Sequence, residues 1–186
     1  MRANLLTKHG LELGETRLPD VWSVRLAQNT DYRGSYMTFC HNKLFHEMTG
    51  ERIAEGNLVE NYAGTFRGYH YSPRSWKFYL CLRGALHYYL VNWDKSHSGY
   101  GEWQQITLLP YHGFFKHPRY ATGMWSIGDS TLLVLQSQYY DAKNPDQVTI
   151  AIDILNAELA KIGKKTIYYP DLPLILSERD ALGEYV

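Results

Sequence analysis

The chain has 186 residues, 45% of them hydrophobic, so it can bury one sizeable core, and we expect a single domain spanning residues 1–186. Its 19 basic and 19 acidic residues cancel, which excludes a global charge that would draw it to nucleic acid or to an anionic membrane surface. It has two cysteines, no basic N-terminus followed by an apolar run and no stretch of roughly 18 apolar residues, so we expect a cytoplasmic protein without disulfides or membrane helices.

The first part of the chain predicts one strand, one turn and one short helix. Hydrophobic residues recur through 18–26 around Pro19 and predict a strand after a loosely specified N-terminus. The sequence Asp-Tyr-Arg-Gly at 31–34 supplies a turn. Apolar residues near helical spacing at 38–48, followed by Gly50, predict a short helix.

From residue 58 to residue 140 the chain is a series of short β-rich runs separated by glycine and proline. Turn signals at that spacing indicate a sandwich or a barrel, and an aromatic content of 15% favours strands. The clearest predicted pair of strands is 77–82 and 85–93, joined at Arg83-Gly84. Both faces of the second strand carry large side chains, so we expect it in the interior of two packed sheets rather than at an exposed edge.

The C-terminal part predicts one more strand at 148–152 and a helix of two turns at 156–162. Leu155 and Leu159 have helical spacing, and Gly163 can end the helix. Taken together, these elements predict an all-β fold, an antiparallel β-sandwich of jelly-roll type with short peripheral helices.

The most informative stretch lies between Arg67 and Gly84. A cupin metal site spaces its ligands as His-x-His, four residues, Glu, six residues and Gly. This chain keeps that spacing and has His70 at the first ligand position, but it has Ser72 at the second and Lys77 at the position of the Glu. A transition metal needs several imidazole or anionic ligands, and an ammonium group in the same space repels it. We therefore expect a cupin that binds no metal and no cofactor.

Four segments resemble those of the dTDP-4-dehydrorhamnose 3,5-epimerase family. Arg-Gly-Tyr-His at 67–70 resembles its Arg-Gly-Leu-His signature, whose histidine is the catalytic base. The turn at 31–34 looks like its Asp-x-Arg-Gly turn, and Lys77 stands where the family has an active-site lysine. Leu-Ser-Glu-Arg-Asp at 176–180 is similar to its Leu-Ser-x-Lys-Asp, whose aspartate hydrogen-bonds the base. The resemblance spans about residues 20–182.

This resemblance implies a cupin jelly-roll fold and a proton-transfer reaction next to a ketone. Removing the C3 or C5 hydrogen of a 4-keto sugar puts negative charge on the ketone oxygen. The resemblance implies that His70 removes this proton, that Asp180 holds the other ring nitrogen, and that Lys77 stabilises the enolate. We expect an isomerase that epimerises a nucleotide-linked 4-keto-deoxysugar at C3, C5 or both.

The chain departs from the family among the residues that would complete the proton transfer. It has Thr122 where the family has a second histidine, and a hydroxyl cannot replace an imidazole as an acid or base. Where the family has the tyrosine that returns a proton from the face opposite the base, the chain has Val134 or Leu135. Tyr139 and Tyr140 follow four to six residues later, and Tyr140 is the candidate donor if a bulge or a register shift brings it into the pocket.

The resemblance also implies the ligand and the assembly. Arg33 and Arg67 are expected to bind the diphosphate, because a planar fork of donors matches phosphate oxygens. Asn61 and Tyr139 complete the predicted substrate-binding set. Thr38, where thymidine-sugar enzymes usually have a glutamate, is closer to relatives that process GDP-linked deoxyheptoses. We therefore expect a GDP- or dTDP-linked sugar as the ligand, a homodimer, and a role in making a surface polysaccharide or a glycosylated metabolite.

Two rival functions fit the same residues. A nucleotide-sugar binder that has lost its proton donor would bind 4-keto sugars without incorporating deuterium from solvent. A different cupin activity, such as a ketoisomerase or a metal-dependent oxygenase, would keep the fold and change the chemistry. Metal bound to the purified protein would indicate the oxygenase.

Overall fold

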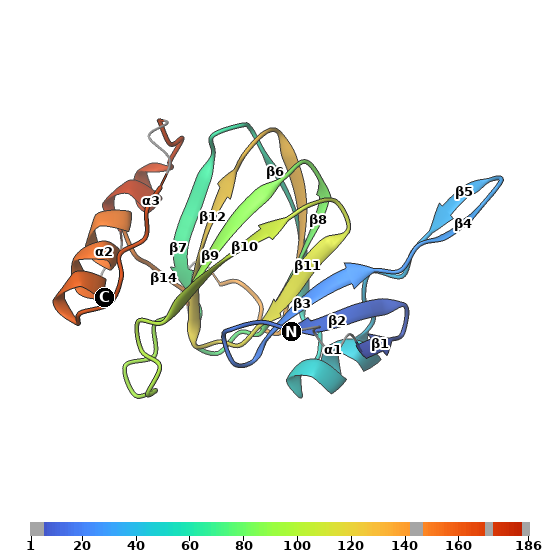
Figure 1. Cartoon of the computed structure of the whole chain (residues 1–186), viewed down its shortest axis with the longest axis horizontal. Coiled ribbons are helices and arrows are strands. Elements are labelled where there is room, and N and C mark those ends of the chain that lie inside the picture. The colour runs from blue at the N-terminus through green and yellow to red at the C-terminus, as the bar shows by residue number, and fades with distance from the viewer. Residues whose placement is uncertain (1–5, 142–146, 170–172, 184–186) are drawn as a thin grey trace.

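The computed structural model describes residues 6–141, 147–169 and 173–183, in which two antiparallel sheets pack face to face (Figure 1). The larger sheet contains, in spatial order, β1 (Leu6–Lys8), β2 (Leu11–Glu15), β3 (Val21–Leu26), β11 (His112–Lys116), β8 (Lys77–Arg83), β13 (Ser130–Gln136) and β6 (Glu55–Asn61). The smaller sheet contains β10 (Trp103–Leu108), β9 (Leu86–Asn92), β12 (Tyr120–Ser126), β7 (Phe66–Tyr71) and β14 (Val148–Thr149). The predicted antiparallel β-sandwich is confirmed.

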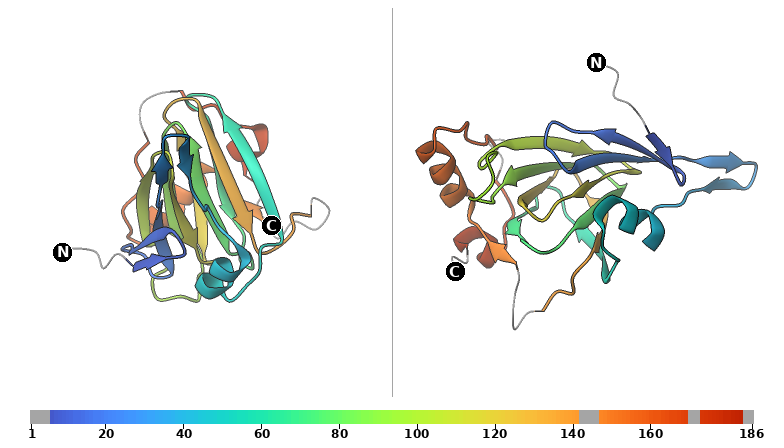
Figure 2. Two further views of the ribbon diagram at one scale, coloured as in Figure 1. Left: turned by 90° about the vertical axis from the view of Figure 1, so that its right-hand side faces the viewer. Right: turned by 90° about the horizontal axis from the view of Figure 1, so that it is seen from below.

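The remaining elements lie outside the sandwich. They are the hairpin of β4 (Asn29–Asp31) and β5 (Gly34–Tyr36), and the helices α1 (Asn42–Thr49), α2 (Ile152–Lys161) and α3 (Glu178–Leu182). Two views at right angles show that the hairpin projects away from the sheets, at the end opposite α2 and α3 (Figures 1 and 2). None of the helices in the described residues is long and apolar enough to cross a membrane.

The side chains of β8 alternate between its two faces, so this strand contributes to two hydrophobic clusters. Tyr79 and Cys81 point into the core between the two sheets, whereas Phe78 and Leu80 pack on the outer face with Leu44 of α1. Successive side chains of a strand point to opposite faces, so this division follows directly from the sequence. Lys77 lies on the same face as Tyr79, which puts its side chain on the inner side of the sandwich.

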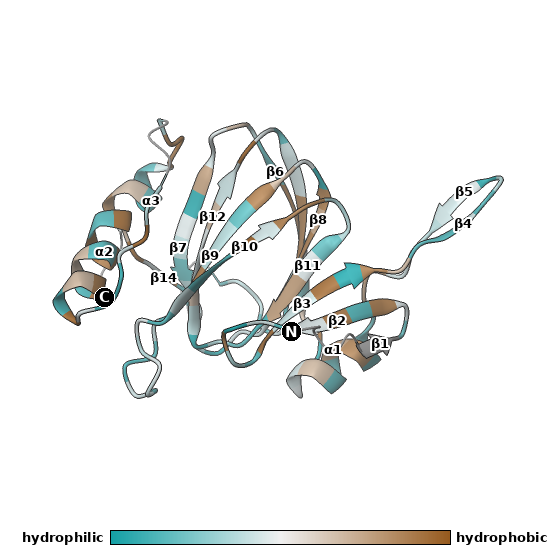
Figure 3. Ribbon diagram, in the orientation of Figure 1, coloured by the Kyte–Doolittle hydropathy of each residue, from teal (hydrophilic) through white to brown (hydrophobic). Residues whose placement is uncertain are grey.

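The strand β9 is buried on both faces, as expected. Tyr88 and Leu90 belong to the core between the sheets, and Tyr89 and Val91 belong to a third cluster with Leu155 of α2. In Figure 3, α2 carries apolar and polar segments side by side, as a helix with one packed face does. The strand lies between β10 and β12, so it is not at an edge.

The predicted pairing of β8 with β9 is wrong, because these consecutive strands lie in different sheets. The chain crosses from one sheet to the other at Arg83-Gly84. Gly84 has a φ of +81°, and a Cβ there would lie 2.4 Å from the carbonyl oxygen of Asp129. The alternation of side chains is the same in a hairpin and in a crossing between sheets, so the sequence pattern could not separate the two.

The ends of the chain also differ from prediction. The strand expected at 18–26 begins at Val21, and the region before it forms β1 and β2 rather than a loose tail. The strand expected at 148–152 has two residues, and α2 begins at Ile152, four residues before the predicted helix. Branched side chains at 148–152 favour a strand locally. Leu155 packs against the smaller sheet, however, and the helix that contains it begins before the predicted start. The short helix expected at 38–48 is confirmed as α1, but it begins at Asn42 and ends at Thr49, followed by Gly50 as its C-cap.

Candidate active site

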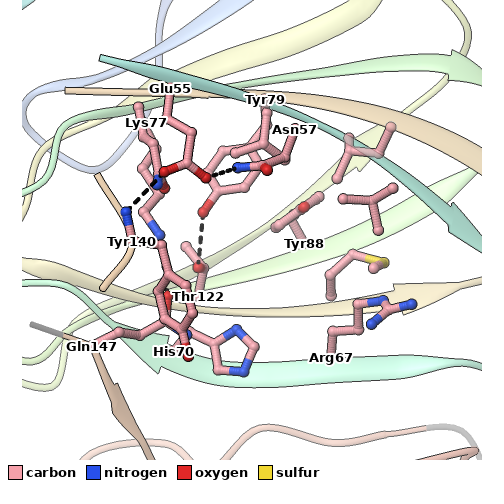
Figure 4. Close-up of a pocket in the computed structure, with 15 residues that line it drawn as sticks. Glu55, Asn57, Arg67, His70, Lys77, Tyr79, Tyr88, Thr122, Tyr140 and Gln147 are labelled. Atoms are coloured by element: carbon pink, nitrogen blue, oxygen red, sulfur yellow. Dashed lines mark hydrogen bonds between the residues drawn. The ribbon is translucent and has the colours of Figure 1, made fainter. Parts of the chain in front are cut away.

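A cavity of about 260 Å³ opens between the two sheets, with polar side chains from both of its walls (Figure 4). The smaller sheet contributes Arg67, His70 and Thr122, and the larger sheet contributes Glu55, Asn57 and Lys77. Tyr140 and Gln147 come from the segment between β13 and β14. The predicted catalytic residues His70, Lys77 and Tyr140 therefore line one cavity, and Asp180 lies directly behind His70.

His70 on β7 is held by Asp180 of α3. The His70 Nε2 and Asp180 Oδ1 atoms are 2.9 Å apart, and the aspartate side chain is only 4% exposed. The other oxygen, Oδ2, accepts a hydrogen bond of 3.2 Å from the backbone amide of Gly68. In the described part of the chain, no hydrogen bond engages His70 Nδ1, so this nitrogen is available to a ligand.

Burial controls the protonation of this pair. It lowers the pKa of His70 below the ordinary histidine value, although the charge of Asp180 opposes this effect. Burial would by itself raise the pKa of Asp180, but the hydrogen bonds from His70 and the Gly68 amide lower it overall. At neutral pH the pair is therefore a neutral imidazole beside a carboxylate, the state required of a base.

Gly68 permits the close approach of β7 to β12 beside the base. Its φ is +111°, and a Cβ there would lie 2.4 Å from the carbonyl oxygen of Thr122. The pairing of the two strands also shifts register between Thr122 and Met124, whereas Thr122 lies directly opposite His70. Glycine at this position therefore lets the backbone bend so that the Gly68 amide donates to Asp180 and His70 lies beside the same carboxylate.

Lys77 reaches the cavity from the wall opposite His70. Its Nζ donates to Gln147 Oε1 at 3.3 Å, and burial lowers the pKa of Lys77 to about 8 despite the nearby charge of Glu55. Ser72, at another of the cupin ligand positions, is 3.5 Å from the same Gln147 oxygen. Across residues 6–141, 147–169 and 173–183, no three His, Cys, Asp or Glu side chains are grouped to hold a metal ion.

Arg67 lines the cavity and is held in place by Asn61. Its Nε donates to Asn61 Oδ1 at 2.7 Å, and its Nη2 donates to the carbonyl oxygen of Glu60 at 3.3 Å. The Asn61 amide in turn donates to Ser130 Oγ at 3.2 Å. Asn61 is buried and does not line the cavity, so it orients the arginine rather than facing a ligand.

Two other predicted binding residues are not brought to this cavity within the chain. Arg33 lies at the tip of the projecting hairpin, where its side chain is 75% exposed and paired with Asp31 at 2.6 Å. Tyr139 faces a small neighbouring depression and is largely exposed. Tyr140 does line the cavity, and its backbone amide donates to Glu55 Oε2 at 2.8 Å.

Tyr79 is a cavity residue that the sequence interpretation missed. It lies two positions after Lys77 on β8, and its hydroxyl is 3.4 Å from Thr122 Oγ1 on the other wall (Figure 4). Its direct partner on β13 is Val134, which also lines the cavity, whereas Leu135 packs on the outer face of the sheet. The two-residue period starting from Lys77 is the signal that would have found it.

Comparisons with known proteins agree with this architecture. The profile of the dTDP-4-dehydrorhamnose 3,5-epimerase family matches residues 15–185. A 4-keto-6-deoxy sugar epimerase from the novobiocin biosynthetic gene cluster of Streptomyces spheroides is 26% identical, with a TM-score of 0.76 over 94% of this chain and 88% of that one. None of the curated protein sequences matches this chain.

Two further solved structures share the fold at lower identity. The dTDP-6-deoxy-D-glucose-3,5-epimerase of Legionella pneumophila, in complex with dTDP-4-keto-L-rhamnose, is 20% identical, with a TM-score of 0.80 over 93% of this chain and 91% of that one. A 3'-monoepimerase from Streptomyces bikiniensis, in complex with dTDP-quinovose, is 22% identical, with a TM-score of 0.74 over 89% and 83% of the two chains. These likenesses confirm the expected cupin jelly roll.

Proposed function

The chain belongs to the dTDP-4-dehydrorhamnose 3,5-epimerase family, and from that membership we propose that it epimerises a nucleotide-linked 4-keto-deoxysugar at C3, C5 or both. One observation supports this most strongly. A neutral imidazole backed by a buried carboxylate faces a lysine across a cavity of about 260 Å³. That space suits a sugar unit, with the nucleotide outside at the rim.

The proposed chemistry divides between the two walls of the cavity. His70 takes the proton from C3 or C5, and the carboxylate of Asp180 stabilises the imidazolium that forms. The electrons move onto the ketone oxygen, where the ammonium of Lys77 stabilises the enolate. In a site without water this electrostatic stabilisation is about 3 kcal/mol. The pKa of Lys77, about 8, leaves it mostly charged at neutral pH.

Arg67 is the proposed diphosphate ligand. It lies at the edge of the cavity, and its guanidinium is oriented by Asn61 and by a backbone carbonyl. Two similar proteins of known structure are complexed with dTDP-linked sugars, whereas Thr38 resembles the residue of relatives that process GDP-linked deoxyheptoses. Competition of dTDP and GDP for the purified protein, measured by calorimetry, decides between the two nucleotides.

We infer a homodimer from the position of Arg33. If Arg33 binds the diphosphate, as the resemblance implies, it must do so in the cavity of a second chain, because its own hairpin projects away from the sandwich (Figure 2). Tyr32 beside it is 97% exposed, and Tyr36 is also largely exposed, which is unusual for large aromatic side chains on a small hairpin. A partner chain would cover these rings.

Inversion of a carbon centre also needs a proton delivered to the face opposite the base. Tyr140, the candidate from the sequence, lies at the mouth of the cavity and is 49% exposed. The proposed function requires a donor on that face but does not depend on which residue supplies it.

Deuterium exchange tests the proposed function. The wild-type protein, incubated in deuterated water with dTDP- and GDP-linked 4-keto-6-deoxyhexoses and with a GDP-linked 4-keto-deoxyheptose, should place deuterium at C3 or C5. His70→Ala should abolish this exchange and leave binding of the nucleotide sugar largely intact. Exchange at the wild-type rate in His70→Ala, or no exchange by the wild type with any of these sugars, contradicts the proposal.

A further inference from the structure

The identity of the second proton-transfer group follows from the two walls of the cavity, and this inference rests on the proposed function. His70 belongs to β7 in the smaller sheet. A sugar ring held against His70 therefore turns its other face toward the larger sheet. The side chains of that sheet that line the cavity and can carry a transferable proton are Lys77, Glu55 and Tyr79.

Two of these three side chains, Lys77 and Glu55, are unsuitable as the proton donor. The Lys77 ammonium is needed at the ketone oxygen, where it must remain charged. The hydrogen bond from the Tyr140 amide lowers the pKa of Glu55, and the Asn57 amide adds a second donor, so Glu55 is an ionised carboxylate without a proton to give. Tyr79 is the remaining donor on the larger sheet.

Tyr79 has the properties required of a fixed acid. Its ring packs against Tyr88 and Phe114, each at 4.9 Å between ring centroids, and the residue is only 6% exposed. Burial raises the pKa of Tyr79 to about 12, so the phenol carries its proton at neutral pH. Its hydroxyl lies 3.4 Å from Thr122 Oγ1, which is longer than the usual 2.7–2.8 Å between two hydroxyls, so no strong hydrogen bond keeps the phenol from turning toward a ligand.

The other phenols of the cavity are less suitable. Tyr88 is on β9 in the smaller sheet, the same wall as His70. Tyr140 lies at the half-exposed mouth, where water competes for its hydroxyl. By contrast, Tyr79 lies on the same face of β8 as Lys77, two residues away, so both side chains line the cavity from the wall opposite His70.

We propose that Tyr79 delivers the proton to the sugar carbon on the face opposite His70. In this step the C–H bond on the His70 side has broken, His70 is an imidazolium, and the electron pair resides in the enolate. The enolate carbon takes the proton of Tyr79, which forms a new C–H bond of inverted configuration and restores the ketone. The phenolate that remains takes a proton from water, and the imidazolium releases one, so no oxidant or reductant is needed.

Replacing Tyr79 by phenylalanine separates inversion from proton removal. Tyr79→Phe keeps the packed ring and removes the hydroxyl alone. Since His70 still removes the proton and can return a deuteron to the same face, deuterium should enter with retained configuration, within about threefold of the wild-type rate. Formation of the inverted sugar should fall by about a hundredfold or more. Both quantities are read by proton NMR of the sugar, and a matched melting temperature confirms folding.

Two other phenylalanine variants complete the experiment. Tyr89→Phe removes a hydroxyl from the opposite face of the smaller sheet, outside the cavity, and should invert the sugar at the wild-type rate. Inversion at the wild-type rate in Tyr79→Phe overturns the inference, as does loss of exchange and inversion together. Loss of inversion in Tyr140→Phe alone also overturns it and assigns the donor to the mouth. A wild-type protein that exchanges no deuterium with any nucleotide sugar refutes the proposed function itself.

Discussion

The imidazole of His70 and the carboxylate of Asp180 are 110 residues apart in the sequence and 2.9 Å apart in the fold. Asp180→Asn keeps the size of this side chain and removes its charge. The imidazolium formed during catalysis then loses its partner, so we expect the rate of deuterium exchange to fall by about a hundredfold. Glu178→Gln, an exposed acid on the same helix, is the matched control and should leave the rate unchanged.

The pH dependence of exchange should be bell-shaped. His70 must be neutral to accept a proton, and burial lowers its pKa, so the acid limb should lie below pH 6.5. Lys77 must be charged, and its pKa of about 8 places the basic limb near that pH. Lys77→Arg keeps a positive charge at higher pH and should move the basic limb upward, whereas Lys77→Met should remove activity across the range. A basic limb that stays near pH 8 in Lys77→Arg shows that another group titrates there.

Asn61 should affect binding without affecting the chemical step. In Asn61→Leu the guanidinium of Arg67 loses its acceptor at 2.7 Å, and a hydrogen bond to a charged group contributes about 1.5–3 kcal/mol. We expect KM to rise about tenfold with kcat unchanged. Asn61→Asp keeps the acceptor and should restore KM. A fall in kcat with constant KM would mean that Asn61 acts on the reacting part of the sugar.

Gly68 should tolerate no side chain. In Gly68→Ala the new Cβ meets the Thr122 carbonyl oxygen at 2.4 Å with a left-handed φ, so the free energy of unfolding should fall by about 3 kcal/mol. Gly128→Ala meets nothing within 4 Å and should change it by less than about 0.5 kcal/mol. Urea denaturation of both variants measures the difference. Equal stability would show that β7 and β12 can separate without cost.

Mixing two defective variants tests the proposed dimer. Arg33→Ala lacks the tip arginine and His70→Ala lacks the base, so each should show little activity alone. If Arg33 serves the partner's cavity, a mixed dimer contains one site with both residues, and activity should reappear after the two chains are mixed and allowed to exchange. A mixture as inactive as its components, or a protein that light scattering shows to be monomeric, would rule this arrangement out.

The sequence predicts the sandwich and a site shared by His70, Lys77 and Asp180, but it does not predict the neighbours of each strand. Glycine and proline at regular spacing indicate short strands, and the co-occurrence of His70, Lys77 and Asp180 indicates a shared site. The alternation of side chains along a strand shows which residues share a face of the sheet. It does not show which strand is the neighbour in that sheet. For that reason β8 and β9 were expected to pair, although they lie in different sheets.

The same limit explains the residues that the sequence interpretation misplaced. Asn61 was expected among the residues that bind the substrate, yet it lies on β6 in the other sheet and accepts a hydrogen bond from Arg67. Tyr79 was overlooked because it resembles a core aromatic, and it packs as one along most of its ring. Its proposed role depends on its hydroxyl lining the cavity opposite His70, an arrangement that arises only when the two sheets pack face to face.

The separation of the two walls also bears on how such enzymes diversify. The proposed base His70 and its carboxylate partner Asp180 belong to β7 and α3, whereas the groups facing them come from β6, β8 and β13, which share no ladder of hydrogen bonds with β7. Under the proposed mechanism, a substitution in the larger sheet would alter the stereochemical outcome while His70 and Asp180 stay in place. The carbon that is inverted could then change between related enzymes without any change in β7 or α3.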